Sequence, residues 1–265
     1  MAALLDPRGE GQCEACRHRL GVTELVEPGQ WSVSDQRGRC VPSLVRSLIA
    51  EAHREATLPI SHFRSGKKTE LPLLHKRVAA IDLGFGASKT CGIAVSQADE
   101  PPLLFLASFG TCVNEIAGLL NDRSIDALVI EAPLSGIFAR NGDPCWRAPF
   151  EKQQIAGKTA TRYWYIQPGS TVCLAAIAFF QRLAAKLAPP KKSVAVFEGF
   201  STFKPKKKSN HLEDACRLLT AARDSSHGTY YEVTVPAEGH LLTALALTGL
   251  ASKSSIAPAV IAWHE

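Results

Sequence analysis

Two apolar segments of this chain each end in a carboxylate, and this pattern constrains the fold more than any other. Residues 78–95 (VAAIDLGFGASKTCGIAV) predict a buried strand, a tight glycine turn and a second strand, with Asp82 at the turn. Residues 125–136 (IDALVIEAPLSG) repeat the pattern, and Glu131 ends that strand. Two acids at strand ends in one α/β domain indicate a divalent-metal site, and therefore chemistry on phosphates.

The rest of the hydrophobic pattern predicts how the chain is divided. Residues 1–76 are expected to be an N-terminal extension, largely loop or disordered, with one amphipathic helix near 42–56. The folded domain is expected over residues 77–265, and it carries a long polar insert at about 137–170.

Apolar runs within the domain predict its strands and helices. The strands are expected at 78–82, 90–96, 103–108, 127–130 and 194–197, with 230–235 as a further short candidate. The helices are expected at 112–121, capped by Thr111, and at 171–188, 211–223 and 240–251. Three consecutive strands followed by alternating helices and strands indicate an α/β fold. We expect a mixed five-stranded sheet, in which three antiparallel strands are followed by parallel strands, flanked by helices.

Composition narrows the class of protein and its compartment. No apolar run reaches the ~18 residues that a membrane-spanning helix needs, so we expect no membrane partner. Residues 1–11 lack the basic start and apolar centre of a secretory signal, and the eight irregularly spaced cysteines resemble reduced core residues, which together favour the cytoplasm. The net charge of +5 permits nucleic-acid binding without establishing it.

A third apolar run, VAVFE at 194–198, also ends in an acid, Glu198. The carboxyl ends of parallel strands meet at one edge of a sheet, so Asp82, Glu131 and Glu198 are expected to converge there. Buried carboxylates need partners, and Mg²⁺ or Mn²⁺ would provide them. The alternative is that each acid is solvated or is the ion-pair partner of a lysine.

At this point the order of motifs resembles a known family. D-x-G-x-G at the first strand, E-A-P-L-S-G after the fourth, the segment FEGFSTFK at 197–204 and the helix start HLEDA at 211–215 are similar to the RNase H-like superfamily. The closest likeness is to predicted nucleases of unknown biological role that are allied to RuvC resolvases. The resemblance covers about residues 78–251 and implies an RNase H-like fold, metal-dependent nuclease activity and a possible homodimer.

The last expected helix departs from the pattern of that family. RNase H-like nucleases usually carry an acid there, whereas this chain has Thr243. His240 stands three residues earlier and Glu238 precedes it, so His240 is a candidate ligand or general base and Glu238 a candidate replacement for the acid. The predicted catalytic residues are therefore Asp82, Glu131, Glu198 and His240. The predicted metal ligands are Asp82, Glu131, Glu198 and Glu238.

Basic and aromatic residues offer a surface for nucleic acid. A lysine run follows Glu198 directly, and its members Lys204, Lys206, Lys207 and Lys208 are predicted to hold a phosphate backbone. The insert mixes cations with aromatic residues, including Trp164 and Tyr165. These aromatic side chains suit either stacking on unpaired bases or packing of the insert onto the domain.

Three functions are compatible with these patterns. The first is a divalent-metal-dependent nuclease, a hydrolase that cleaves phosphodiester bonds of DNA or RNA. The second is a non-catalytic nucleic-acid-binding protein of the same fold, suggested by Thr243. The third is a nucleotide binder of the actin and sugar-kinase type, because the segment DLGFGASKT at 82–90 resembles its phosphate loop and would direct Ser88 and Lys89 toward phosphates.

Overall fold

The structure is a computed structural model, and it describes two short strands near the N-terminus and most of the chain from residue 61 onward. The described residues are 22–27, 30–33, 61–85, 88, 90–98, 100–155, 158–161, 163–166, 169–201, 210–248 and 256–264. The chain divides into two units, Met1–Pro59 and Ile60–Glu265. Within the described ranges, every helix is too short or too polar to cross a membrane.

In the first unit, two strands pair with each other. β1 (Val22–Glu27) and β2 (Gln30–Val33) are antiparallel. They lie within the extension that the sequence predicts to be largely loop or disordered. The helix predicted near 42–56 lies outside the described residues.

The second unit contains all five strands that the sequence predicts. They are β4 (Val78–Asp82), β5 (Cys91–Val95), β6 (Leu103–Ala107), β7 (Ala127–Glu131) and β11 (Val194–Phe200). Their order in the sheet is β6-β5-β4-β7-β11. β5 is antiparallel to β4 and β6, whereas β4, β7 and β11 are mutually parallel. The predicted α/β class with a mixed sheet is therefore confirmed.

Three further strands make the sheet eight-stranded, not five-stranded. β3 (Phe63–Ser65) and β14 (Val260–Trp263) share the free edge of β11: β3 pairs with its first half and β14 with its second half, both in parallel. β12 (Gly228–Tyr231) then adds antiparallel to β14, close to the short strand considered at 230–235. Because β3 belongs to the sheet, the second unit begins upstream of the boundary expected at residues 76 and 77.

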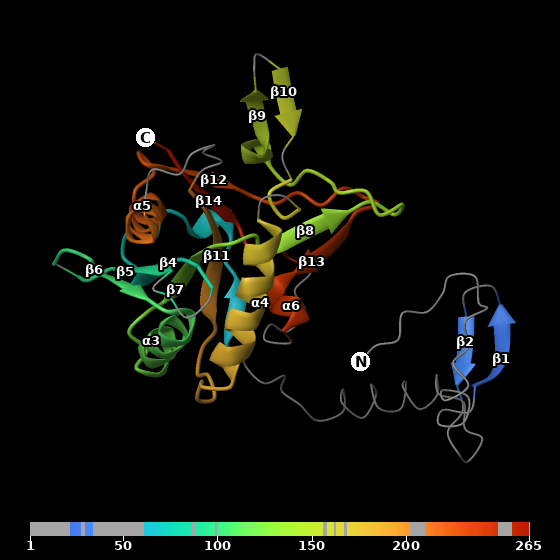
Figure 1. The fold of residues 1–265 in the computed structure, drawn as a ribbon, viewed down its shortest axis with the longest axis horizontal. Helices are drawn as coiled ribbons and strands as arrows, with labels where there is room; N and C mark the ends of the chain where they lie inside the picture. The colour runs from blue at the N-terminus through green and yellow to red at the C-terminus, as the bar shows by residue number, and fades with distance from the viewer. Residues whose placement is uncertain are drawn as a thin grey trace. The chain divides into compact units, whose positions relative to one another are not determined.

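Helices cover both faces of this sheet (Figure 1). Apolar side chains of α3 (Phe109–Asn121) and α4 (Ser170–Ala184) pack on one face, against Ile81 and Ile130. α5 (His211–Arg223) packs on the other face, against Ala80 and Val129. Neighbouring strand residues thus contact different helices, as the alternation of side chains along a strand requires. The cap of α3 is Ser108, whose hydroxyl accepts a hydrogen bond from the backbone N–H of Thr111, the residue predicted as the cap.

The helix predicted at 240–251 is not formed. Residues His240–Thr243 are instead a strand, β13, which pairs antiparallel with β8 (Ser135–Phe138). In the described residues that follow, up to residue 248, the chain forms a single helical turn, α6 (Ala244–Leu247), and the Thr243 hydroxyl caps it by accepting from the backbone N–H of Ala246 at 3.1 Å. Pairing with β8 thus overrides the helical preference of a Leu- and Ala-rich segment.

The insert after β8 is folded onto the second unit. It contains a 3₁₀ turn, η2 (Pro149–Glu151), and the antiparallel strands β9 (Lys152–Ile155) and β10 (Lys158–Thr161); a similar turn, η1 (Lys68–Glu70), follows β3. The Trp164 ring lies 4.9 Å from that of Phe200 and 6.4 Å from that of Phe150, centroid to centroid. Trp164 and Tyr165 are buried, so for these two side chains the packing interpretation is confirmed.

Candidate metal centre

The strand-end acids Asp82 and Glu131 lie side by side. They are Cα partners in the parallel register of β4 and β7, so their side chains leave the same face of the sheet. That is the face on which Ala80 and Val129, two residues earlier in each strand, pack under α5. The prediction that these two acids converge is therefore consistent with the strand register.

A third carboxylate reaches the same place from α5. Asp214 lies in the first turn of this helix, which begins at the cap Asn210, whose side chain accepts from the backbone N–H of Glu213 at 2.9 Å. The start of α5 can approach the sheet because residue 92, opposite Asp82 in β5, is glycine; a Cβ there would overlap the carbonyl group of His211. Because Gly92 has no side chain, the start of α5 has room to lie beside the strand ends.

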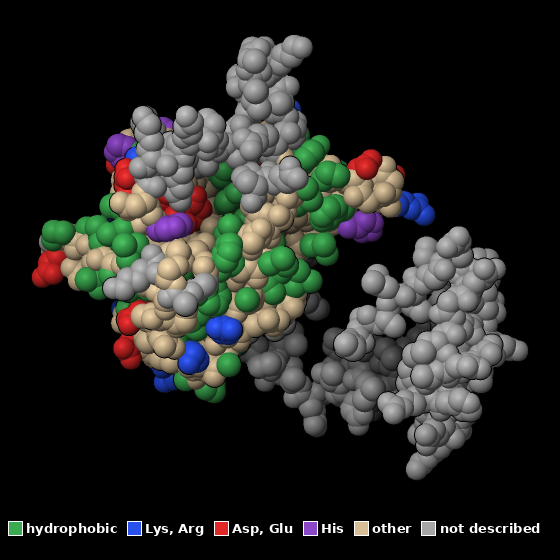
Figure 2. Space-filling view, in the orientation of Figure 1, with side chains coloured by type: hydrophobic (Ala, Val, Ile, Leu, Met, Phe, Trp, Pro, Cys, Tyr) green, Lys and Arg blue, Asp and Glu red, His purple; other side chains and the backbone are tan. Residues whose placement is uncertain are grey.

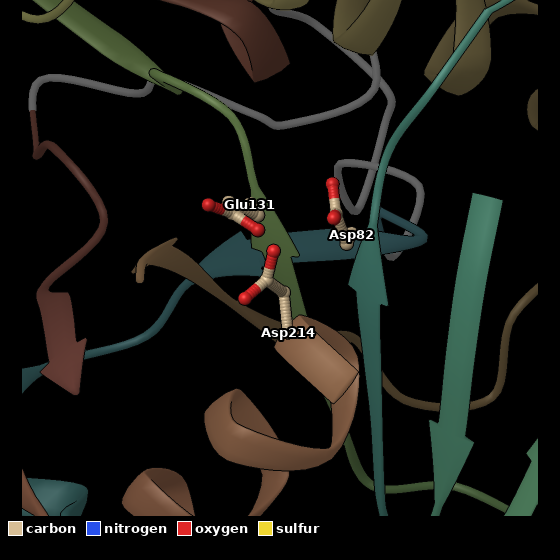
Figure 3. Close-up of side chains that lie close together, drawn as sticks. All are labelled: Asp82, Glu131 and Asp214. Carbon is tan, nitrogen blue, oxygen red and sulfur yellow. The ribbon is translucent and has the colours of Figure 1, made fainter. Parts of the chain in front are cut away.

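The three carboxylates form a compact group (Figure 3). One oxygen each from Asp82, Glu131 and Asp214 lies within 4.8 Å of the others. Asp82 is 4% exposed and Asp214 is fully buried, while Glu131 is partly exposed. Asp and Glu side chains are visible in a recess in the upper part of the face drawn in Figure 2. These three residues could hold a metal ion, because Mg²⁺ and Mn²⁺ prefer oxygen ligands.

Neighbouring polar groups orient these carboxylates. His211, at the first position of α5, hydrogen-bonds through Nδ1 to Oδ2 of Asp82 at 2.8 Å. The Ser201 hydroxyl donates to Oε1 of Glu131, and Arg217 donates to Oδ1 of Asp214 at 3.4 Å. Such contacts fix the direction in which a carboxylate presents its remaining oxygen, as partners of metal ligands do.

Glu198, predicted as a third ligand, is not a member of this group. It is the register partner of Ile130, not of Glu131, and therefore points to the face that α3 and α4 cover. There it is fully buried, and it accepts from the Leu134 backbone N–H at 2.7 Å and from the Arg147 guanidinium at 2.9 Å. The alternative weighed for strand-end acids, an ion pair, applies to Glu198, although its partner is an arginine and not a lysine.

Arg147 connects Glu198 to a second acid of the insert. Its guanidinium also lies 3.0 Å from Glu151, and all three side chains are completely buried. Burial raises the pKa of the Glu198 carboxyl, although the charge of Arg147 and the N–H of Leu134 act in the opposite direction. Desolvation likewise acts against the charged form of Arg147, but the two carboxylates outweigh it and raise its pKa. We call Glu198, Arg147 and Glu151 the buried ion cluster.

The remaining predicted site residues lie elsewhere. Glu238 is exposed ahead of β13, His240 is exposed within it, and neither belongs to the group formed by Asp82, Glu131 and Asp214. The lysines predicted to bind nucleic acid, Lys204, Lys206, Lys207 and Lys208, lie outside the described residues, as does Lys89 of the alternative phosphate loop. Ser88 of that loop is exposed.

The sequence interpretation missed Asp214 and His211. Both stand in the segment HLEDA, which the resemblance had marked only as a helix start. The expectation of a helix at 240–251 led us to look for the last acid of the family pattern at Thr243, and to consider Glu238 as its replacement. In the structure, the fold and the site define an α/β protein with three clustered carboxylates at the carboxyl edge of its parallel strands.

Comparisons with known proteins gave no relative for this chain: no family model, no curated protein and no solved structure matches it.

Proposed function

We propose that this protein is a divalent-metal-dependent nuclease with an RNase H-like fold that hydrolyses phosphodiester bonds of DNA or RNA. The observation that carries the proposal is the approach of Asp82, Glu131 and Asp214 oxygens to within 4.8 Å of one another from three separate elements. Gathering three carboxylates in a largely buried place is costly, and a cation bound by all three would offset that cost in addition to the contact of Asp214 with Arg217.

The spacing of the oxygens fits a small divalent ion. Oxygen ligands at about 2.1 Å from an octahedral Mg²⁺ are about 3 Å apart when adjacent and about 4 Å apart when opposite. The carboxylate group here needs only small side-chain adjustments to reach that geometry. Mn²⁺ accepts the same ligands, so either ion suits the site.

The order of the acids along the chain supports the family. In the RNase H-like superfamily, which the motifs resemble, acids stand at the end of the first strand, at the end of the fourth strand and on a later helix. Asp82 ends β4, Glu131 ends β7 and Asp214 lies on α5. Three antiparallel strands followed by parallel ones, in the order β6-β5-β4-β7-β11, agree with the same resemblance.

Each residue then has a separate task. Asp82, Glu131 and Asp214 hold the ion, while His211 and Ser201 keep the Asp82 and Glu131 carboxylates in position. When bound, Mg²⁺ or Mn²⁺ would stabilise charge on the phosphate and favour ionisation of the attacking water. Nucleic acid as the partner, a homodimer and a cytoplasmic location are further parts of this proposal, taken from the resemblance, the charge and the composition.

The reason for considering a non-catalytic nucleic-acid-binding protein was the residue at position 243. That alternative depended on Thr243 standing where an acid is expected, but Thr243 caps α6 and Asp214 supplies a third carboxylate from α5. Thr243 is therefore no reason to expect an inactive protein.

The test is cleavage of single- and double-stranded DNA and RNA in Mg²⁺, Mn²⁺ or EDTA. We expect cleavage only with a metal, and we expect Asp82→Asn, Glu131→Gln and Asp214→Asn each to lower its rate by more than about 100-fold, beyond the usual effect of losing a ligand's supporting group. The matched control is Glu213→Gln, because Glu213 neighbours Asp214 but is exposed. Cleavage that persists undiminished in Asp82→Asn would overturn the assignment.

A further inference from the structure

The second unit has a cavity of about 410 Å³ at the edge of the sheet opposite the carboxylates. Its walls come from the residues that precede or begin the parallel strands, among them Phe63, Arg77, Ile125 and Val194. A five-residue strand spans about 17 Å, so the cavity is separate from the candidate metal centre. Its volume lies within the range of small-molecule sites.

The floor of the cavity is apolar. Phe63 and Ile125 are each 1% exposed, Val194 is buried, and Leu120 and Leu187 continue the same surface. Apolar lining with a few polar groups at one side is the usual construction of a pocket for an organic ligand. The floor therefore favours a ligand with a flat or compact apolar part.

The rim of the cavity is cationic. Arg77, Arg123, Lys191 and Lys192 line it, and among the lining residues that the structure describes there is no carboxylate. In the view of Figure 2, Lys and Arg side chains gather at the lower end of the second unit, away from the acidic recess. A rim of this charge favours an anion, and Arg in particular suits the oxygens of a phosphate.

Two of these cations are held in place by one acid behind the rim. Oδ1 of Asp126 lies 2.7 Å from Nζ of Lys192, and Oδ2 of Asp126 lies 3.2 Å from Nε of Arg77. Within the described part of the chain, Arg123 and Lys191 have no acidic side chain within ion-pair distance. The cavity thus combines two anchored cations with two that remain available to a ligand.

The wall formed by residues 187–192 is fixed to its surroundings. Asn121, the last residue of α3, donates to the Lys186 carbonyl at 3.1 Å and accepts from the Ala188 backbone N–H at 3.0 Å. His62 Nε2 lies 3.2 Å from the Ala188 carbonyl oxygen. The cavity is therefore formed before any ligand arrives, which lowers the entropic cost of binding.

We propose that this cavity binds a small phosphate monoester that carries a compact ring system, of the size of a mononucleotide. The phosphate lies against Arg123 and Lys191, and the ring lies over the apolar floor. A free mononucleotide and the terminal nucleotide of a strand both present a phosphate and a ring. The volume of the cavity, about 410 Å³, suits the free mononucleotide.

The test is isothermal titration of the full chain with adenosine monophosphate, adenosine or inorganic phosphate, in EDTA so that the metal centre takes no part. We expect adenosine monophosphate to bind at least about tenfold more tightly than either fragment, because each fragment loses one half of the contacts. The double variant Arg123→Ala, Lys191→Ala is expected to weaken binding at least about tenfold. Arg140→Ala, which removes an exposed cation outside the cavity, is the matched control and leaves binding unchanged.

The metal centre provides a second control. Asp82→Asn is expected to bind adenosine monophosphate as the natural chain does, so that failure of the nuclease proposal and failure of this one are distinguishable. The proposal is overturned if adenosine monophosphate does not bind at millimolar concentration, or if Arg140→Ala weakens binding as much as the cavity variant. It is also overturned if an oligonucleotide binds where adenosine monophosphate does not.

Discussion

The two faces of the sheet carry acidic clusters of different construction near the same edge. Under α5, Asp82, Glu131 and Asp214 gather, and their hydrogen-bond partners include His211 and Ser201. Under α4, the buried ion cluster is built around one completely buried cation, because the guanidinium of Arg147 lies within 3.0 Å of both Glu151 and Glu198, whereas Arg217, the cation beside Asp214, is partly exposed and 3.4 Å away.

This difference shows that a strand-end acid is not a metal ligand by position alone. Glu131 and Glu198 both end apolar runs of parallel strands, but the register places Glu198 beside Ile130, one residue before Glu131. Successive side chains leave opposite faces, so a shift of one residue sends the two acids to different clusters. Under the proposed function, one face carries the metal site and the other face carries a buried ion cluster that stabilises the fold.

The largest expected effect follows from removing the internal cation. Arg147→Met leaves Glu198 and Glu151 buried without their guanidinium, and we expect the free energy of unfolding to fall by about 3–5 kcal/mol. Urea denaturation measures the loss. The triple variant that also carries Glu198→Gln and Glu151→Gln should recover part of it, since no uncompensated charge then remains.

The carboxylates under α5 should respond differently. Asp214→Asn removes one of three clustered like charges but also the ion pair with Arg217, so its urea midpoint is expected to stay close to that of the natural chain. A loss for Asp214→Asn as large as that for Arg147→Met would contradict the contrast between the two clusters.

The next effect is stabilisation by added metal. If the ion binds only the folded chain, Mg²⁺ or Mn²⁺ at a hundredfold excess over its Kd should stabilise the protein by about 2.7 kcal/mol. Thermal unfolding with and without the metal measures this shift. Asp82→Asn and Asp214→Asn should lose the shift and Glu198→Gln should retain it; an equal shift in all three variants would remove the distinction between the faces.

A smaller effect is expected when Glu198 alone is neutralised. Glu198→Gln keeps an oxygen that can accept from Leu134 and Arg147, so the loss of stability should be about 1.5 kcal/mol. The rate of cleavage per folded molecule should be unchanged. The equivalent substitution on the other face, Glu131→Gln, should abolish cleavage while leaving the urea midpoint close to its natural value. A loss of cleavage per folded molecule in Glu198→Gln would contradict this prediction and would indicate that Glu198 belongs to the metal site.

The sequence predicts the central sheet well because its strands are short apolar runs that end at turns. Asp82 and Glu131 follow from the same pattern, since each is the last residue of its run. The face of the sheet to which the Glu198 side chain points depends on the pairing of β11 with β7. This pairing is a tertiary contact, and the sequence of the apolar run at 194–198 does not reveal it. β3 was missed for a similar reason: three residues carry almost no periodicity, and only their pairing with β11 makes them a strand.

The wrong position expected for the acid on the last helix has a different physical cause. The segment HLLTALAL at 240–247 is rich in good helix formers, and propensity alone favours a helix there. Backbone pairing with β8 decides otherwise, and it leaves His240 exposed on a strand. The acid that joins Asp82 and Glu131 lies instead on α5, whose first turn the resemblance marked only as a helix start.

The smallest expected effect therefore comes from His240, the histidine that the sequence favoured as a site residue. His240 is exposed and pairs with Phe138 only as a residue of the strand register, so His240→Ala should change the free energy of unfolding by less than about 0.5 kcal/mol and the rate of cleavage by less than about twofold. His211→Ala is the matched comparison, because that side chain supports Asp82 and its loss should lower the rate about 10- to 100-fold. Cleavage rates measured on both variants at saturating metal decide between them. If His240→Ala lost more activity than His211→Ala, the site would extend to β13 and the carboxylates under α5 would be only part of it.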